Sequence, residues 1–199
     1  VEQLEEAGHH PSGELRGYKS DVWEGGHRVP FIARWPGRIP KGQVSDQMTS
    51  TTDIFATLAS VVGYPLAEKD ARDSFDMLPV LLGKQDAGTS VRPHLLTQSF
   101  RGEFQLRKGN WKYCDHKGSG GNNYTRGNLQ KYALKDTAPE APGQLYDLEN
   151  DPGETTNLYF THEAKRKELQ QLLQKLKSSG RSAPRKRTPL GMKNIPKVD

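Results

Sequence analysis

The chain has 199 residues, which suffices for one domain or for a domain with an appendage, and only 33% of them are hydrophobic. No stretch approaches the ~18 apolar residues that a membrane-spanning helix needs, so we expect no membrane partner. The 20 Gly and 13 Pro spread along the chain exclude a coiled coil. The single cysteine, Cys114, excludes a disulfide framework within the chain and a zinc site built from several cysteines.

The net charge of +5, from 29 Lys and Arg against 24 Asp and Glu, is concentrated at one end of the chain. Residues 178–199 carry a single acid, Asp199, and six basic residues: Arg181, Arg185, Lys186, Arg187, Lys193 and Lys197. Because the rest of the chain is neutral, the charge describes a tail, and we expect no nucleic-acid partner. The tail has no apolar periodicity and is predicted to be disordered.

The first half of the chain predicts short elements separated by glycines and prolines. Residues 1–7 resemble the end of a helix that Gly8 closes, which suggests a fragment. Residues 29–35 are apolar and predict a buried strand beside a proline. The apolar spacing of residues 51–62 predicts a helix, and residues 74–82 predict a shorter apolar helix or turn.

The second half predicts an antiparallel sheet and one long helix. Residues 94–99 are a candidate strand, residues 104–113 predict a hairpin around a glycine, and residues 145–148 predict another strand. The glycine-rich residues 118–142 predict an exposed, mobile insertion. Residues 161–177 predict a helix. Its apolar stripe consists of Leu169, Leu172, Leu173 and Leu176.

The loop that precedes the predicted strand at residues 29–35 concentrates cationic side chains and glycines. It contains His9, His10 and Lys19. A lysine ammonium can donate hydrogen bonds to an oxyanion such as sulfate or phosphate. From the residue types alone, an ordinary surface loop is the preferred interpretation.

Five sequence blocks carry a family resemblance. Residues 17–37 contain G-x-K-x-x-x-[WY]-E-G-G-x-R-x-P and a W-P-G turn. Residues 50–58, 78–83, 109–113 and 144–158 match T-D-x-x-x-T-L, L-x-x-L-L-x-G with one residue fewer, G-x-W-K-[LY] and L-Y-D-L-x-x-D-P-x-E-x-x-N-L. In this order they closely resemble the type I sulfatases, the arylsulfatase-like family, over residues 8 to about 177.

The resemblance implies an α/β, alkaline-phosphatase-like sulfatase fold, of which this chain is the C-terminal fragment. Residues 1–88 would be the end of the large α/β domain. Residues 89–177 would form a small α+β domain with an antiparallel sheet and one long helix, and residues 178–199 the basic tail. The missing N-terminal sulfatase portion is then an expected partner, and the family suggests an exported protein (periplasmic, extracellular or lysosomal).

The resemblance also implies a sulfuric ester hydrolase that uses a formylglycine nucleophile and calcium. The family's formylglycine motif, C/S-x-P-x-R, and its calcium ligands lie upstream of the matching blocks, so this chain alone is expected to be inactive and to hold no metal. Cys114 is followed by neither the Pro nor the Arg of that motif. We interpret it as a cysteine at the end of a strand.

Lys19 is the one functional residue that the resemblance carries over. It would contact a sulfate oxygen and the bridging oxygen, and so stabilise charge on the departing alcohol. His9 and His10 are candidates to face the organic part of the substrate, a sulfate-ester small molecule or a sulfated glycan. Glu24 and Arg28 are interpreted as scaffold. The alternative function is a non-catalytic module that binds polyanions through this loop and the basic tail.

Overall fold

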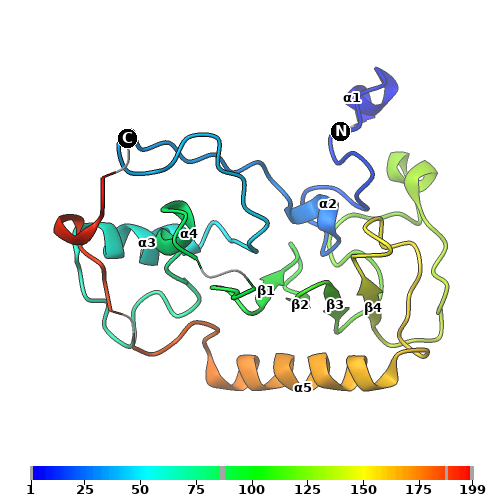
Figure 1. Cartoon of the computed structure of the whole chain (residues 1–199). Helices are drawn as coiled ribbons and strands as arrows, with labels where there is room; N and C mark the ends of the chain where they lie inside the picture. The colour runs from blue at the N-terminus through cyan, green and yellow to red at the C-terminus, as the bar shows by residue number, and fades with distance from the viewer. Residues whose placement is uncertain (1, 86–87, 187, 198–199) are drawn as a thin grey trace. The chain divides into compact units, whose positions relative to one another are not determined.

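The computed structural model describes residues 2–85, 88–186 and 188–197. They form two compact units, residues 1–30 with 96–174 and residues 31–95 with 175–199 (Figure 1). Three residues used in the predictions, Val1, Arg187 and Asp199, lie outside the described residues. The predicted first helix is present as α1, Glu2–Glu6. Within the described residues, no helix combines the length and apolarity needed to cross a bilayer.

The first unit is built on the predicted antiparallel sheet (Figure 1). Its four strands, in the spatial order β1-β2-β3-β4, are β1 Leu95–Gln98, β2 Phe104–Lys108, β3 Trp111–Cys114 and β4 Gln144–Asp147. Lys108 pairs with Trp111, which leaves a two-residue turn whose Gly109 has φ +58°. A glycine meets that left-handed requirement without strain. The predicted hairpin is therefore confirmed.

One face of the sheet packs against the long helix α5, Glu163–Ser179 (Figure 1). The cross-strand row Leu106, Tyr113 and Leu145 is buried and shares one face. Trp111, on the same face as Tyr113, contacts His162 and lies under Lys165. Leu169, Leu173 and Leu176 of the predicted stripe are buried, and Leu172 is half-buried. The helix and its apolar face are thus confirmed.

The opposite face of the sheet is covered by a segment from the start of the chain. Val22 and Trp23 pack with Cys114 and Tyr146 in a buried cluster. The indole N–H of Trp23 donates to Gln144 Oε1 at 3.0 Å. The short helix α2, Glu24–His27, follows directly. The sheet therefore fixes the position of the loop that immediately precedes Trp23.

The second unit contains helices α3, Asp53–Val62, and α4, Leu78–Leu81. Gly63 caps α3 at φ +77°. Thr52, which precedes the helix, makes no side-chain cap bond. Instead, Asp53 pairs with buried Arg92 at 2.9 Å (Nε to Oδ2) and accepts the Ser50 N–H. An ion pair, in addition to local capping, therefore holds the start of α3.

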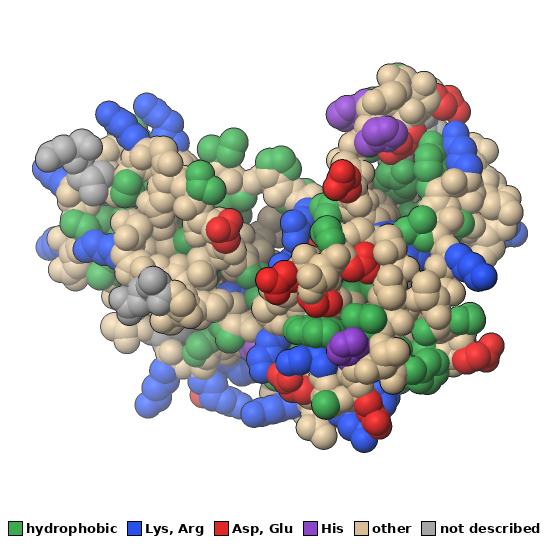
Figure 2. Space-filling model, turned by 45° about the vertical axis from the view of Figure 1, so that its right-hand side comes forward, with side chains coloured by type: hydrophobic (Ala, Val, Ile, Leu, Met, Phe, Trp, Pro, Cys, Tyr) green, Lys and Arg blue, Asp and Glu red, His purple; other side chains and the backbone are tan. Residues whose placement is uncertain are grey.

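Helix α3 buries its small and polar residues and exposes its large apolar residues. The buried set is Asp53, Ala56, Thr57, Ala59 and Ser60. The exposed set is Ile54, Phe55, Leu58 and Val62. On the face drawn in Figure 2, hydrophobic side chains reach the surface among charged ones. The predicted helix is correct, but these four residues of its apolar stripe stay exposed, whereas Val61 packs against a buried cluster.

The predicted buried strand at residues 29–35 is wrong. The segment forms no strand, and Val29, Phe31 and Ile32 are 68%, 55% and 91% exposed. An apolar run becomes a strand only when neighbouring strands satisfy its backbone groups. The described residues supply no such neighbour, so the segment stays extended and open.

The described part of the basic tail packs instead of remaining disordered. The N–H groups of Ser182 and Ala183 donate to the carbonyl of Arg72. Ala183 joins a buried cluster with Phe75, and Ile195, after the short helix η2 (Met192–Asn194), is 2% exposed. The composition of the tail predicted disorder because it is dominated by charged residues. The few apolar residues that pack, such as Ala183 and Ile195, do not stand out in it. The predicted domain boundaries stay predictions.

Candidate functional site

Lys19 lies in a tight turn on the loop between α1 and α2. Its side chain is exposed, and it makes no hydrogen bond or ion pair with any other side chain that the structure describes. Its backbone carbonyl accepts a hydrogen bond from Asn122 Nδ2 at 3.0 Å. The backbone of Lys19 is therefore held while its ammonium remains available for a ligand.

The residue after Lys19 has a strained backbone. Ser20 has φ +99°, a region that residues with a side chain rarely adopt and that costs about 1–3 kcal/mol. Its carbonyl accepts the N–H of Phe100 at 3.0 Å. A Cβ at Gly121 would lie 2.2 Å from that carbonyl oxygen, so only glycine fits there. Close backbone contacts on two sides thus maintain the strained turn.

Buried Asp21 ties this turn to the glycine-rich insertion. Its carboxylate accepts the N–H of Tyr18 at 2.9 Å, the N–H of Asn122 at 2.8 Å and the hydroxyl of Tyr124 at 2.6 Å. The next N–H, from Val22, donates to the carbonyl of Ser119. Residues 118–124, predicted to be a mobile loop, are thus docked on the Lys19 turn. The sequence analysis missed this role of Asp21.

The glycine pair in α2 is explained by close backbone packing on the same loop. A Cβ at Gly25 would lie 2.3 Å from the carbonyl oxygen of Gly17. A Cβ at Gly26 would lie 2.4 Å from that of Asp21. Both distances are far below van der Waals contact, so the E-G-G sequence lets α2 press directly against the turn that carries Lys19.

A buried ion cluster anchors the start of α2 to the sheet. Lys112 Nζ lies 3.1 Å from Glu24 Oε1 and 2.8 Å from Glu154 Oε1. Glu154 also accepts the backbone N–H of Glu24 at 2.6 Å. Arg28 and Arg107 pair with the second oxygen of Glu24, at 2.8 and 3.0 Å. The interpretation of Glu24 and Arg28 as scaffold is confirmed.

The charges of this cluster stabilise one another. Burial alone would raise the pKa of Glu24, but Lys112, Arg107 and Arg28 outweigh it and lower the pKa to about 2. Burial would lower the pKa of Lys112, yet Glu154 and Glu24 raise it. Burial raises the pKa of Glu154, the more enclosed carboxyl, against the effect of Lys112. Lys112 is therefore a permanent cation within the fold.

The ion cluster joins three of the five family-like blocks. Glu24 belongs to the E-G-G-x-R block, Lys112 to the G-x-W-K block and Glu154 to the D-P-x-E block. Sequence spacing cannot show that these blocks meet, because 88 residues separate Glu24 from Lys112. The guanidinium of Arg16 extends the assembly by donating to the carbonyl of Glu154 at 2.8 Å.

The two candidate substrate-facing histidines lie in the neighbouring loop. His9 and His10 are both exposed. His10 Nδ1 lies 2.5 Å from Glu5 Oε2, which ties it to α1. Among the described residues no hydrogen bond or ion pair joins either histidine to Lys19. Their roles therefore stay predictions.

Cys114 is the last residue of β3 and is fully buried. Burial raises the pKa of its thiol to about 12. Near neutral pH it therefore carries no thiolate, the form that a cysteine nucleophile needs. This agrees with its interpretation as a strand-end cysteine.

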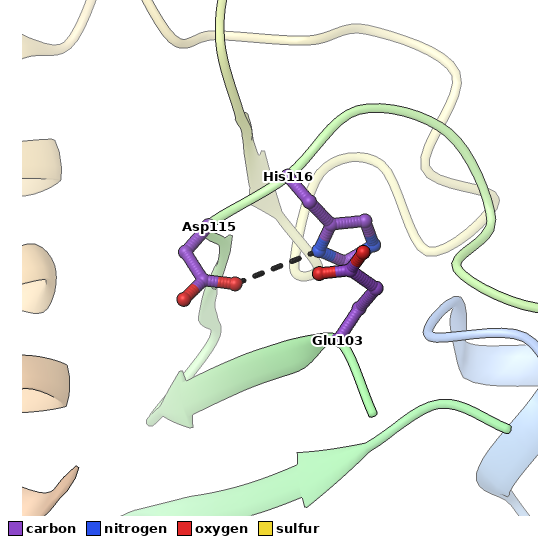
Figure 3. A group of neighbouring side chains, drawn as sticks. All are labelled: Glu103, Asp115 and His116. Atoms are coloured by element: carbon purple, nitrogen blue, oxygen red, sulfur yellow. Dashed lines mark ion pairs between the residues drawn. The ribbon is translucent and has the colours of Figure 1, made fainter. Parts of the chain in front are cut away.

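A possible metal-binding group lies at the end of the β2–β3 hairpin, where Glu103, Asp115 and His116 converge (Figure 3). It does not suit the calcium that the family resemblance implies. Calcium takes six to eight oxygen ligands, whereas this group offers an imidazole nitrogen and few oxygens. This group is therefore not assigned to calcium, and the expectation that the calcium ligands lie outside this chain stays a prediction.

The chain belongs to the sulfatases. The family model for the C-terminal region of N-sulphoglucosamine sulphohydrolase matches residues 13–181. This match includes the Lys19 loop, the ion cluster and the sheet with its long helix. The expected family and fold class are thereby confirmed.

Individual relatives are sulfatases of much greater length. The chain is 34% identical over 171 residues to an N-acetylgalactosamine-6-O-sulfatase of Bacteroides thetaiotaomicron, covering 86% of this chain and 31% of that protein. It is 36% identical over 152 residues to human arylsulfatase A, covering 74% of this chain and 29% of that protein. The chain thus spans about a third of the length of these relatives.

Solved structures show the same architecture. A structure from work on the metabolism of multiple glycosaminoglycans by Bacteroides thetaiotaomicron matches with a TM-score of 0.71 at 36% identity, covering 86% of this chain and 34% of that one. A structure in complex with D-glucosamine-2-N,6-O-disulfate matches with a TM-score of 0.53 at 19% identity, covering 81% of this chain and 30% of that one. The second likeness shows the fold alone.

Proposed function

We propose that this chain forms the C-terminal part of a sulfatase that hydrolyses sulfate esters, with Lys19 as its contribution to catalysis. The observation that carries the proposal is the exposed Lys19 side chain on a strained turn that Asp21 and Asn122 hold in place. Strained, over-determined backbone of this kind clusters at functional sites. A fixed backbone beside a free ammonium suits a preorganised anion site.

The chemistry assigned to Lys19 is electrostatic. When the ester S–O bond breaks, negative charge grows on the departing alcohol oxygen. An ammonium near the bridging oxygen stabilises that charge, and it can donate a proton to the alcohol. The formylglycine that attacks sulfur, and the calcium that binds sulfate, would be supplied by residues outside this chain, so the chain alone would be inactive.

The uncovered apolar surfaces support the presence of further chain in the active protein. The large residues of α3 and the segment around Phe31 and Ile32 are exposed in the second unit. Residues that large are normally buried, and a contiguous apolar face marks a packing surface. Further strands and helices of an α/β domain would cover both.

We propose a sulfated glycan as the substrate class. The support is the relative at 34% identity that is an N-acetylgalactosamine-6-O-sulfatase. His9 and His10 would face the organic part of this substrate. The alternative, a polyanion-binding module, has less support, because Arg181 and Arg185 of the tail are already engaged by Glu68.

The test uses the longer protein in which this chain is preceded by the formylglycine motif. Lys19→Ala should lower kcat on an activated aryl sulfate by on the order of 10²–10³, the typical loss for one preorganised donor. The matched control is Lys69→Ala, another exposed lysine, which should leave kcat unchanged. A kcat within about twofold of the parent for Lys19→Ala would remove the proposed role.

A further inference from the structure

We propose that Glu103, Asp115 and His116 form a binding site for a divalent transition-metal ion of the zinc type. One ligand atom from each residue lies within 4.8 Å of the other two (Figure 3). The contact of 3.6 Å between His116 Nδ1 and Asp115 Oδ1 is close to the ~3.4 Å that separates two ligands of a tetrahedral ion at about 2.1 Å. This site is separate from the sulfate chemistry, and it does not depend on the proposed function.

The sheet register brings Glu103 and His116 together, and Asp115 is the neighbour of His116 in the chain. Gln105 pairs with Cys114, so the antiparallel ladder, continued two residues, places Glu103 opposite His116. The Asp115 N–H donates to the carbonyl of Phe104 at 3.4 Å, which shows that the ladder extends beyond the strand ends. The three ligands thus lie within two residues of the ends of β2 and β3, which set their positions.

The backbone of Glu103 is fixed independently. Its carbonyl accepts the N–H of Ser99 at 2.9 Å, and its own N–H donates to Ser99 Oγ at 3.2 Å. Sites built on such rigid elements need little reorganisation when an ion binds.

The imidazole of His116 is the observation that most clearly points to a ligand. Its side chain is only 10% exposed, and Nδ1 has a long ion-pair contact with Asp115 Oδ1 at 3.6 Å (Figure 3). Nε2 makes no hydrogen bond among the described residues. Buried polar atoms are normally satisfied, and leaving one unpaired costs about 1–3 kcal/mol. A metal ion would satisfy one of these nitrogens.

The charges around His116 favour a cation. The carboxylates of Glu103 and Asp115 lie beside the imidazole and offer negative charge to a divalent ion.

Space at the site is left by a glycine. A Cβ at Gly120 would lie 3.0 Å from His116 Nε2 and 2.7 Å from Ser99 Oγ. Any larger residue would therefore crowd the imidazole. Gly120 also accepts the N–H of Arg101, so the site borders the segment that docks on the Lys19 turn. A bound ion would stiffen that segment.

The ligand set defines the class of ion. One imidazole and two carboxylates suit zinc, cobalt or manganese, and water would complete a tetrahedral shell around zinc. Calcium and magnesium prefer oxygen ligands and would bind more weakly. The selectivity order expected at this site is therefore zinc and cobalt ahead of calcium.

The test is a titration of the metal-free 199-residue chain with Zn²⁺, and with Co²⁺ as a spectroscopic probe. One equivalent should bind with a Kd of 10 µM or tighter, by a rough expectation for three protein ligands, and Co²⁺ should give a visible absorption band. Glu103→Gln should weaken Zn²⁺ binding by about tenfold or more, and His116→Gln by about 100-fold. The matched controls, Glu140→Gln and His162→Gln at exposed positions, should bind like the parent.

Three outcomes would overturn the proposal. They are no Zn²⁺ binding at tens of micromolar, an unchanged affinity in both Glu103→Gln and His116→Gln, or a loss of binding confined to a His9→Gln/His10→Gln variant. Circular dichroism checks the fold of each variant. Should His116→Gln unfold, the decision rests on Glu103→Gln, which removes a ligand charge while preserving the size of the side chain.

Discussion

Lys112 Nζ lies 2.8 Å from Glu154 Oε1, and neither side chain is exposed at all. The pair lies on the sheet face that α2 covers, and Glu24 completes it. Breaking a buried ion pair by removing one partner is strongly destabilising, because the remaining charge stays buried without compensation. We therefore expect the fold to be most sensitive to substitutions that remove one charge of this buried pair.

Replacing Lys112 with Met should lower the free energy of unfolding by about 3–5 kcal/mol, since Glu24 and Glu154 would face each other without a cation. Urea denaturation of the chain measures this. The control is Lys108→Met, which removes the half-exposed pair with Glu168 and should cost about 1 kcal/mol or less. If both variants lost the same stability, the cluster would not anchor the fold.

The pH dependence of stability should show the titration of His27. Burial, followed by the charge of Lys112, lowers its pKa from 6.5 to about 4. Between these values the unfolded chain binds a proton that the folded chain does not, so stability falls as the pH is lowered from 6.5 to 4. The total loss in free energy of unfolding from this titration is about 3 kcal/mol.

His27→Gln isolates that contribution. Above pH 7 the unfolding free energies of parent and variant should differ by a constant amount. As the pH falls toward 4, the parent should lose stability relative to the variant. Denaturation at a series of pH values provides the measurement. A difference that does not change with pH would show that His27 titrates normally in the folded chain.

Gly121→Ala should displace the turn that carries Lys19. The added Cβ would lie 2.2 Å from the Ser20 carbonyl oxygen, and backbone cannot move away as a side chain can. We expect a loss of about 1–3 kcal/mol, the range for overpacking, together with faster amide exchange near Asp21. Gly153→Ala, whose Cβ would lie 3.3 Å from its nearest atom, is the control and should be much milder. If the two variants lost equal stability, the close backbone contact at Gly121 would not be what holds the turn.

Ile195→Ala tests whether the tail is docked. Ile195 is 2% exposed and packs with Leu78 and Leu82, so its truncation should cost about 2–5 kcal/mol. Met192→Ala, at a half-exposed position in the same tail, should cost less than about 1 kcal/mol. Thermal unfolding compares the two. If Ile195→Ala were as stable as Met192→Ala, the result would support the disordered tail that the composition predicts.

The sequence by itself determined the elements that depend on local patterns. The two-residue turn at Gly109 set the β2–β3 hairpin, the leucine spacing set α5, and Gly63 set the end of α3. These succeed because turn geometry and apolar periodicity act within a few residues. The family resemblance, which depends on ordered blocks, was likewise readable from the sequence.

Only the tertiary structure decided which groups meet and which faces are covered. Long stretches of sequence separate the members of the ion cluster, Glu24, Lys112 and Glu154. The same is true of Asp21 and Asn122, which are joined by a hydrogen bond. Residues 29–35 have the composition of a buried strand, yet they remain open, because strand formation requires partners that a local pattern cannot supply. Burial and long-range ion pairing depend on the whole fold, since a side chain's solvation is set by its spatial neighbours rather than by its neighbours in the chain.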